Sequence, residues 1–179
     1  MNTATKYGNY CALFCIGIIM VLHFAGVQPL IFMGMSTFLT FIVDLIFIFI
    51  SIRSTRLKDY NGFIDFKNAA KAGLTTIIIS TILVSFFIYL YYAFINPGFI
   101  DKFLPNYESW MKVHSKKSAE EMKEMLTTIS TGFTPISAAW GTFSQTLFIE
   151  TFIVLIFARF MRSNPPEHPN QTESAEPTE

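Results

Sequence analysis

The sequence predicts an all-α, polytopic membrane protein with four transmembrane helices arranged as two hairpins. The apolar residues fall in long unbroken runs, and about 18 or more consecutive apolar residues suffice to cross a bilayer. Of the 179 residues, 51% are hydrophobic and 15% are charged, whereas soluble domains average about 25% charged residues. The formal net charge is zero, so the charge balance gives no reason to expect a nucleic-acid partner.

Four apolar runs are the expected spans, at residues of about 10–30, 32–52, 69–95 and 135–160. Pro29 separates the first two and predicts a tight turn, because proline cannot donate the hydrogen bond that a helix interior needs. We expect the first run to be an uncleaved helix, since it is too long for the apolar region of a signal peptide. Cys11 and Cys15 lie four residues apart on one helical face, so we expect no disulfide and treat them as small apolar fillers.

The loop between the third and fourth runs, residues 97–134, carries two helical patterns of its own. Aromatic residues recur at helical spacing from Phe99 to Trp110, with Pro105 as an interruption. Ser118 to Glu121 has the capping-box pattern of a helix start. We expect short amphipathic helices that either lie on the membrane interface or cap the bundle without touching lipid, and the sequence favours neither alternative.

The chain therefore divides into a four-helix transmembrane domain, residues 1–162, and a polar tail, residues 163–179. The tail has almost no apolar residues to bury, so we expect it to be disordered. Basic residues gather after the second and fourth runs, at Arg53, Arg56, Lys58, Lys67, Lys71, Arg159 and Arg162. Because loops rich in Lys and Arg face the cytoplasm, we expect both termini inside. Expected partners are the lipid bilayer and, as further candidates, a second copy of the chain or other membrane proteins.

Three short stretches resemble a known family. Residues 62–73, GFIDFKNAAKAG, resemble its entry into the third helix; residues 94–104, FINPGFIDKFL, look like its exit from that helix; residues 132–141, GFTPISAAWG, are similar to its entry into the fourth. The family comprises small four-helix membrane proteins, mainly from Bacteroidota bacteria, described as domain of unknown function 4199. The resemblance implies a location in the inner membrane of a bacterial cell and carries over no active-site residue.

The first of these stretches also has the physical pattern of a helix start. Asp65 is a candidate N-cap, because its carboxylate can accept from the free backbone N–H groups that follow it. Ala69, Ala70 and Gly73 are small enough to permit the close approach of another helix.

Two acidic residues, Asp44 and Glu150, stand alone in apolar runs. Each precedes an arginine by nine residues, which is about 13–14 Å along a helix and close to half of a hydrocarbon core of about 30 Å. Both acids are therefore expected near the midplane, and the equal spacing also hints at a parallel repeat of two hairpins, although chance explains it as well. No Lys or Arg lies within a run, and a charge at that depth costs about 2.5–3.5 kcal/mol. We expect the two carboxyls to share a polar core as a coupled pair, at least one of them protonated.

Polar residues of the third and fourth runs are expected at the same level. They are Ser80, Thr81, Ser85, Gln145 and Thr146. In a structural interpretation, neutral carboxyls hydrogen-bond across helices and fix the packing of an accessory membrane subunit, at about 0.6 kcal/mol per bond. In a functional interpretation, Asp44 and Glu150 conduct ions or protons in a small oligomeric channel or transporter. Four helices are few for a transporter, which favours the structural interpretation.

The sequence contains no catalytic motif. It lacks the metalloprotease, nucleophile-elbow and P-loop patterns and any zinc-spaced set of Cys and His. An intramembrane aspartyl protease would need two aspartates in Gly-rich motifs, and Glu150 stands in place of the second. We therefore expect no enzymatic activity, no metal and no cofactor.

Overall fold

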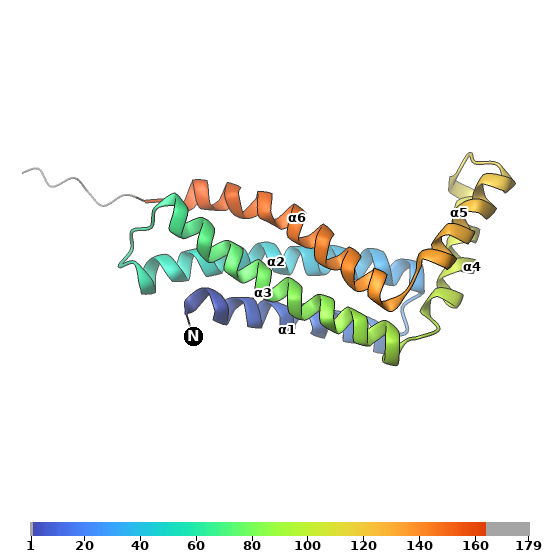
Figure 1. The fold of residues 1–179 in the computed structure, drawn as a ribbon, viewed down its shortest axis with the longest axis horizontal. Helices are drawn as coiled ribbons and strands as arrows, with labels where there is room; N and C mark the ends of the chain where they lie inside the picture. The colour runs from blue at the N-terminus through green and yellow to red at the C-terminus, as the bar shows by residue number, and fades with distance from the viewer. Residues whose placement is uncertain (1, 164–179) are drawn as a thin grey trace, which may run out of the picture.

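The computed structural model describes residues 2–163, which form an all-α fold (Figure 1). Its elements are α1 (Thr3–Phe24), α2 (Pro29–Asp59), α3 (Phe66–Leu90), the π-helical turn η1 (Tyr91–Ile95), α4 (Phe99–His114), α5 (Ala119–Gly132) and α6 (Pro135–Met161). Within these residues there is no strand, only an isolated bridge between Ile64 and Ser163. The predicted all-α class is confirmed.

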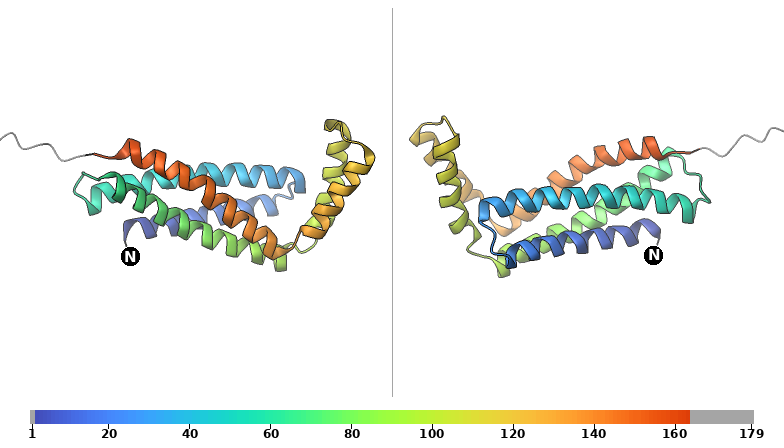
Figure 2. Two further views of the ribbon diagram at one scale, coloured as in Figure 1. Left: turned by 45° about the horizontal axis from the view of Figure 1, so that its top comes forward. Right: turned by 180° about the vertical axis from the view of Figure 1, so that it is seen from behind.

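Helices α1, α2, α3 and α6 run side by side, while α4 and α5 form a separate pair at one end of the bundle (Figures 1 and 2). Helix α3 is central: it contacts α1, α2 and α6, whereas α2 and α6 touch each other only sparsely. Both ends of the described chain lie at the end of the bundle opposite α4 and α5 (Figure 1). The four long helices, α3 counted with η1, are each long and apolar enough to cross a membrane.

The first two helices differ from the expected boundaries. Helix α1 begins at Thr3, where the Asn2 side chain accepts from the Thr5 N–H at 2.8 Å, and it ends before Gly26, whose φ is +66°. Pro29 is not in the turn but at the first position of α2, where its missing N–H has no helical partner to lose. Helix α2 continues past residue 52 to Asp59, because no helix-breaking residue follows until Gly62, whose φ is +92°.

Small residues let α3 approach both of its main neighbours. Ala69, Ala70 and Gly73 are buried, and a Cβ added at Gly73 would lie 2.6 Å from Cγ1 of Val154 on α6. A Cβ added at Gly8 of α1 would lie 2.9 Å from the carbonyl oxygen of Thr76 on α3. The predicted close approach at Gly73 is confirmed, and Gly8 provides a second one.

The predicted N-caps are both present. The Asp65 carboxylate accepts from the Asn68 N–H at 2.9 Å at the start of α3. At the start of α5, the Ser118 N–H donates to Oε2 of Glu121 at 2.7 Å, and the Glu121 N–H donates to the Ser118 hydroxyl at 3.2 Å. This reciprocal pair is the expected capping box.

The capping box of α5 gives a pH-dependent prediction. The hydrogen bond from the Ser118 N–H, with that from its hydroxyl, holds the pKa of Glu121 below its ordinary value. Because the pKa of Glu121 is lower in the folded state, this hydrogen bond stabilises the start of α5 at pH values above the ordinary glutamate pKa. The stabilisation is lost as the pH falls through the lowered pKa of Glu121. An NMR titration of the Ser118 amide should therefore have its midpoint below the glutamate value. The variant Ser118→Pro, which lacks the donor N–H and the hydroxyl, should return the Glu121 titration to that value; an unchanged midpoint would contradict the assignment.

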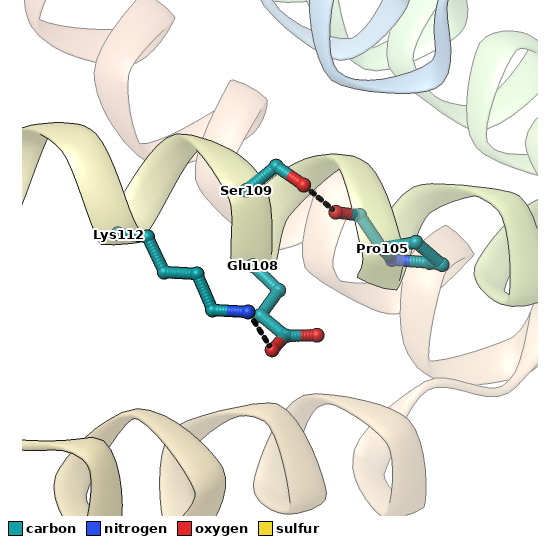
Figure 3. Close-up of polar contacts among 4 residues, drawn as sticks. All are labelled: Pro105, Glu108, Ser109 and Lys112. Carbon is teal, nitrogen blue, oxygen red and sulfur yellow. Dashed lines mark hydrogen bonds and ion pairs between the residues drawn. The ribbon is translucent and has the colours of Figure 1, made fainter.

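Helix α4 runs through Pro105, although the sequence predicted an interruption there (Figure 3). Proline removes one backbone donor from the helix, and its ring is exposed, so it displaces no neighbour. Side chains bond to the carbonyls around it: Ser109 Oγ donates to the Pro105 oxygen at 2.8 Å, and Asn106 Nδ2 to the Lys102 oxygen at 2.7 Å. A Lys112–Glu108 ion pair of 2.7 Å spans the next turn. These contacts support the helix across the proline.

The last residue that the structure describes, Ser163, contacts the bundle. The Ser163 N–H donates to the Ile64 oxygen at 2.8 Å, which fixes the end of α6 to the loop between α2 and α3. The rest of the predicted disordered tail, residues 164–179, lies outside the described residues.

Candidate functional site

The site begins with Asp44 of α2, which faces the interior of the bundle and is 7% exposed. Its Oδ1 accepts from Cys11 Sγ at 3.0 Å and lies 3.8 Å from Cys15 Sγ, both on α1. Ser80 Oγ of α3 donates to the same oxygen at 3.5 Å. Three helices therefore converge on one carboxylate oxygen.

Glu150 of α6 adds the fourth helix. It is 2% exposed, and its carboxyl lies within hydrogen-bonding reach of the Asp44 carboxyl. Its Oε2 has no hydrogen-bond partner among the described residues, and no ion pair in that part of the chain involves either acid. Two carboxyl groups in contact repel when both are ionised, so the pair requires a proton or another cation.

A polar crevice leads to this pair. We use this name for two adjoining cavities of about 530 and 130 Å³, which share Thr37, Thr40, Thr142 and Gln145 in their walls. The larger lies among α2, α3, α6 and the end of α5, on the side where α4 and α5 stand. The smaller ends at Asp44 and Glu150. The crevice follows the line where α2 and α6 touch only sparsely.

The other polar residues predicted for the site are placed in three different ways. Ser80 is 3% exposed and bonds to Asp44. Gln145 and Thr146 line the crevice. Thr81 and Ser85 are buried, but their hydroxyls have no hydrogen-bond partner among the described residues; Ser85 lines an apolar cavity between α3 and α6. The structure therefore does not bring these last two into the network around Asp44.

Sequence reasoning missed two groups of residues in the site. Cys11 and Cys15 were treated as apolar fillers, yet both free thiols face Asp44. Of the threonines in the crevice walls, Thr146 was predicted but Thr37, Thr40 and Thr142 were overlooked, although their spacing was a usable signal. On α2 the stripe is Thr37, Thr40, Asp44, and on α6 it is Thr142, Thr146, Glu150. Steps of three or four residues place each acid and its hydroxyls on one helical face.

The fold and the site define the class of protein: a helical protein whose four long helices are long and apolar enough to cross a membrane, with a buried pair of acids in its interior. The chain belongs to the family described as Protein of unknown function (DUF4199), whose model matches residues 6–163. This confirms the family to which the three short stretches pointed. No curated protein and no solved structure matches the chain.

Proposed function

We propose that this chain is an integral membrane protein whose Asp44–Glu150 pair binds small cations, protons included, that enter through the polar crevice. The function is that of a cation- or proton-conducting membrane protein, and it involves no catalysis. The observation that carries the proposal is the crevice itself, because hydroxyl and amide side chains stand among the apolar ones in its walls and its smaller cavity is lined by both Asp44 and Glu150.

A pair of acids that only fixes helix packing does not need a cavity beside it. Buried hydroxyls in a bilayer normally bond to a backbone carbonyl one turn before them or across to another helix. Thr40 and Thr142 in the crevice walls do so, donating to the carbonyl oxygens of Ser36 at 2.8 Å and Ala138 at 3.0 Å, and the crevice leaves room beside them that is large enough for several water molecules. Ionisable side chains in membrane helices that face a water-filled cavity commonly mark ion or proton pathways.

The proposed setting is the inner membrane of a bacterial cell, with the four long helices crossing as two hairpins. The helix ends that carry the basic residues, the end of α2, the start of α3 and the end of α6, lie at the same end of the bundle as both chain ends (Figure 1). This supports a cytoplasmic location for both termini, with α4 and α5 on the outer side. The crevice would then open outward.

An accessory structural subunit is the second candidate function. It is favoured by the contacts at Asp44 Oδ1, which link α2 to Cys11 of α1 and Ser80 of α3. Such a neutral network would fix helix packing without moving any ion. Its partners would be the bilayer and a second copy or another membrane protein.

Flux measurements in reconstituted vesicles separate the two candidates. Purified protein in liposomes with a trapped pH dye and an imposed cation gradient should carry flux above that of empty liposomes. The double variant Asp44→Asn, Glu150→Gln should lose that flux, because the amides keep the side-chain volumes but cannot exchange a charge. The control Glu124→Gln removes an exposed carboxylate of α5 and should leave the flux unchanged.

Thermal unfolding in detergent shows whether the double variant is folded. A folded double variant with wild-type flux, or wild-type protein with no flux above empty liposomes, would reject conduction and leave the structural candidate.

A further inference from the structure

We infer that the interior site binds a divalent transition-metal ion of thiophilic character, with Cys11, Cys15 and Asp44 as ligands and Glu150 as the fourth. The inference rests on the proposed function and names the class of cation that the site takes. It also departs from the expectation, drawn from the sequence, that the chain holds no metal.

The ligand atoms are already gathered. The two sulfur atoms and a carboxylate oxygen of Asp44 all lie within 4.8 Å of one another, and all three residues are buried. A tetrahedral ion with metal–sulfur bonds of about 2.3 Å and metal–oxygen bonds of about 2.0 Å holds its donors about 3.3–3.8 Å apart. The distances from Asp44 Oδ1 to Cys11 Sγ, 3.0 Å, and to Cys15 Sγ, 3.8 Å, lie on either side of the sulfur–oxygen separation of about 3.5 Å that this geometry gives. Small side-chain rotations would therefore close the site.

Glu150 provides an independent indication of a ligand. Its Oε2 is buried and has no hydrogen-bond partner in the described chain, although the residue is 2% exposed. An unpaired buried oxygen costs free energy unless something binds it. Its carboxyl lies near that of Asp44, but Glu150 is not among the three residues whose ligand atoms lie within 4.8 Å of one another, so its side chain would rotate toward the ion to complete the set.

Charge balance favours a divalent ion. No Lys or Arg lies among the residues around the pair, so the interior is neutral when both acids carry protons. The sulfur ligands bind as thiolates, so one divalent cation displaces the two thiol protons of Cys11 and Cys15 to water in the crevice and leaves the same net charge, with Asp44 and Glu150 bound through oxygens of their neutral carboxyls. A monovalent cation would neutralise only one of the two thiolates.

The donor set selects among divalent cations. Mg²⁺ and Ca²⁺ prefer six or more oxygen ligands, whereas two sulfurs one helical turn apart suit Zn²⁺, Co²⁺ or Fe²⁺. The spacing of Cys11 and Cys15 places both sulfurs on one face of α1, as a chelating pair requires.

A titration with Co²⁺ tests the inference directly, because this ion reports its ligands by absorption. Purified full-length protein under reducing conditions should develop a sulfur-to-cobalt charge-transfer band and the intense visible bands of four-coordinate cobalt. Zn²⁺ should displace the cobalt and Mg²⁺ should not. The chain has two cysteines, so a thiolate band in the wild-type protein identifies them without any variant.

Variants then assign the ligands. Cys11→Ser with Cys15→Ser should abolish the charge-transfer band, and Glu150→Gln should weaken Co²⁺ binding about tenfold or more. The control Glu124→Gln should bind as the wild type does. Tetrahedral bands without the charge-transfer band, or binding that ignores the cysteine changes, would overturn thiol ligation.

The outcomes also distinguish this inference from the proposed function. A wild-type protein that carries proton flux but binds no Co²⁺ would overturn the metal site and leave conduction intact. A protein that binds Co²⁺ through sulfur but carries no flux would support the metal site and reject conduction.

Discussion

Replacing Gly73 by alanine will destabilise the bundle by about 1–3 kcal/mol, the usual effect of overpacking a close-packed interior. The new Cβ would lie 2.6 and 3.1 Å from the two Cγ atoms of Val154 and 3.3 Å from Cδ1 of Ile52. Val154 is fully buried, and a β-branched side chain in a helix has one strongly preferred rotamer, so it cannot turn away. Helices α3 and α6 must therefore separate. Thermal or chemical unfolding in detergent gives the loss.

A second substitution and a matched control make this prediction specific. Val154→Ala removes both Cγ atoms, so the double variant should recover part of the stability that Gly73→Ala alone loses, and a double-mutant cycle should show favourable coupling. A Cβ at Gly17 of α1 meets nothing within 4 Å, and alanine favours a helix over glycine by about 1 kcal/mol. Gly17→Ala should thus be neutral or stabilising. Equal effects at the two glycines would contradict the close packing of α3 and α6.

Replacing Tyr91 by alanine will cost about 3 kcal/mol or more, as large-to-small changes of buried aromatic residues do. Tyr91 is 1% exposed, and its ring stacks on Phe32 of α2 with centroids 5.7 Å apart. Its hydroxyl lies 3.0 Å from His23 Nδ1 of α1 and accepts from Asn96 Nδ2 at 3.2 Å. The side chain thus joins α1, α2 and the π-helical turn at the end of the bundle where α4 begins.

The conservative variant separates packing from hydrogen bonding. Tyr91→Phe keeps the ring but leaves the His23 and Asn96 groups without their partner, so about 1–2 kcal/mol should be lost. Tyr10 is 43% exposed, and Tyr10→Ala should change the unfolding free energy by less than about 1 kcal/mol. Similar losses for Tyr91→Ala and Tyr10→Ala in the same unfolding assay would show that Tyr91 does not anchor this end.

The long apolar elements were predictable because their signal is summed over many residues. Twenty or so apolar side chains in a row outweigh any single exception, and the N-caps at Asp65 and Ser118 follow from local hydrogen bonding alone. The predicted helix boundaries were wrong at prolines, because a proline is compatible with more than one local structure. Pro29 fits a turn as well as the first position of a helix, and Pro105 stays within α4 because exposure and neighbouring side chains tolerate it.

The site was predictable only in part, because depth can be counted along a helix but rotation about its axis cannot. Equal counts to Arg53 and Arg159 gave Asp44 and Glu150 the same depth, and both acids are buried and line the same cavity. Thr81 has nearly the same depth as Ser80, yet the next position on a helix points about 100° away, and Thr81 makes no bond to the acids. Which face of α1 meets α2 depends on the packing of all four helices, and this is why the thiols of Cys11 and Cys15 were not assigned to the site.

The central claim is that water reaches the Asp44–Glu150 pair through the crevice while the outer face of α6 faces lipid. Thr146 lines the crevice, and Phe148, two residues away at almost the same depth, is 67% exposed on the surface of the bundle. In a Cys11→Ser, Cys15→Ser background, single cysteines at these positions should react very differently with a membrane-impermeant thiol reagent added on the α4–α5 side of reconstituted vesicles. We expect Thr146→Cys to be labelled and Phe148→Cys to stay unreacted; an inert Thr146→Cys, or equal labelling of both, would contradict the claim.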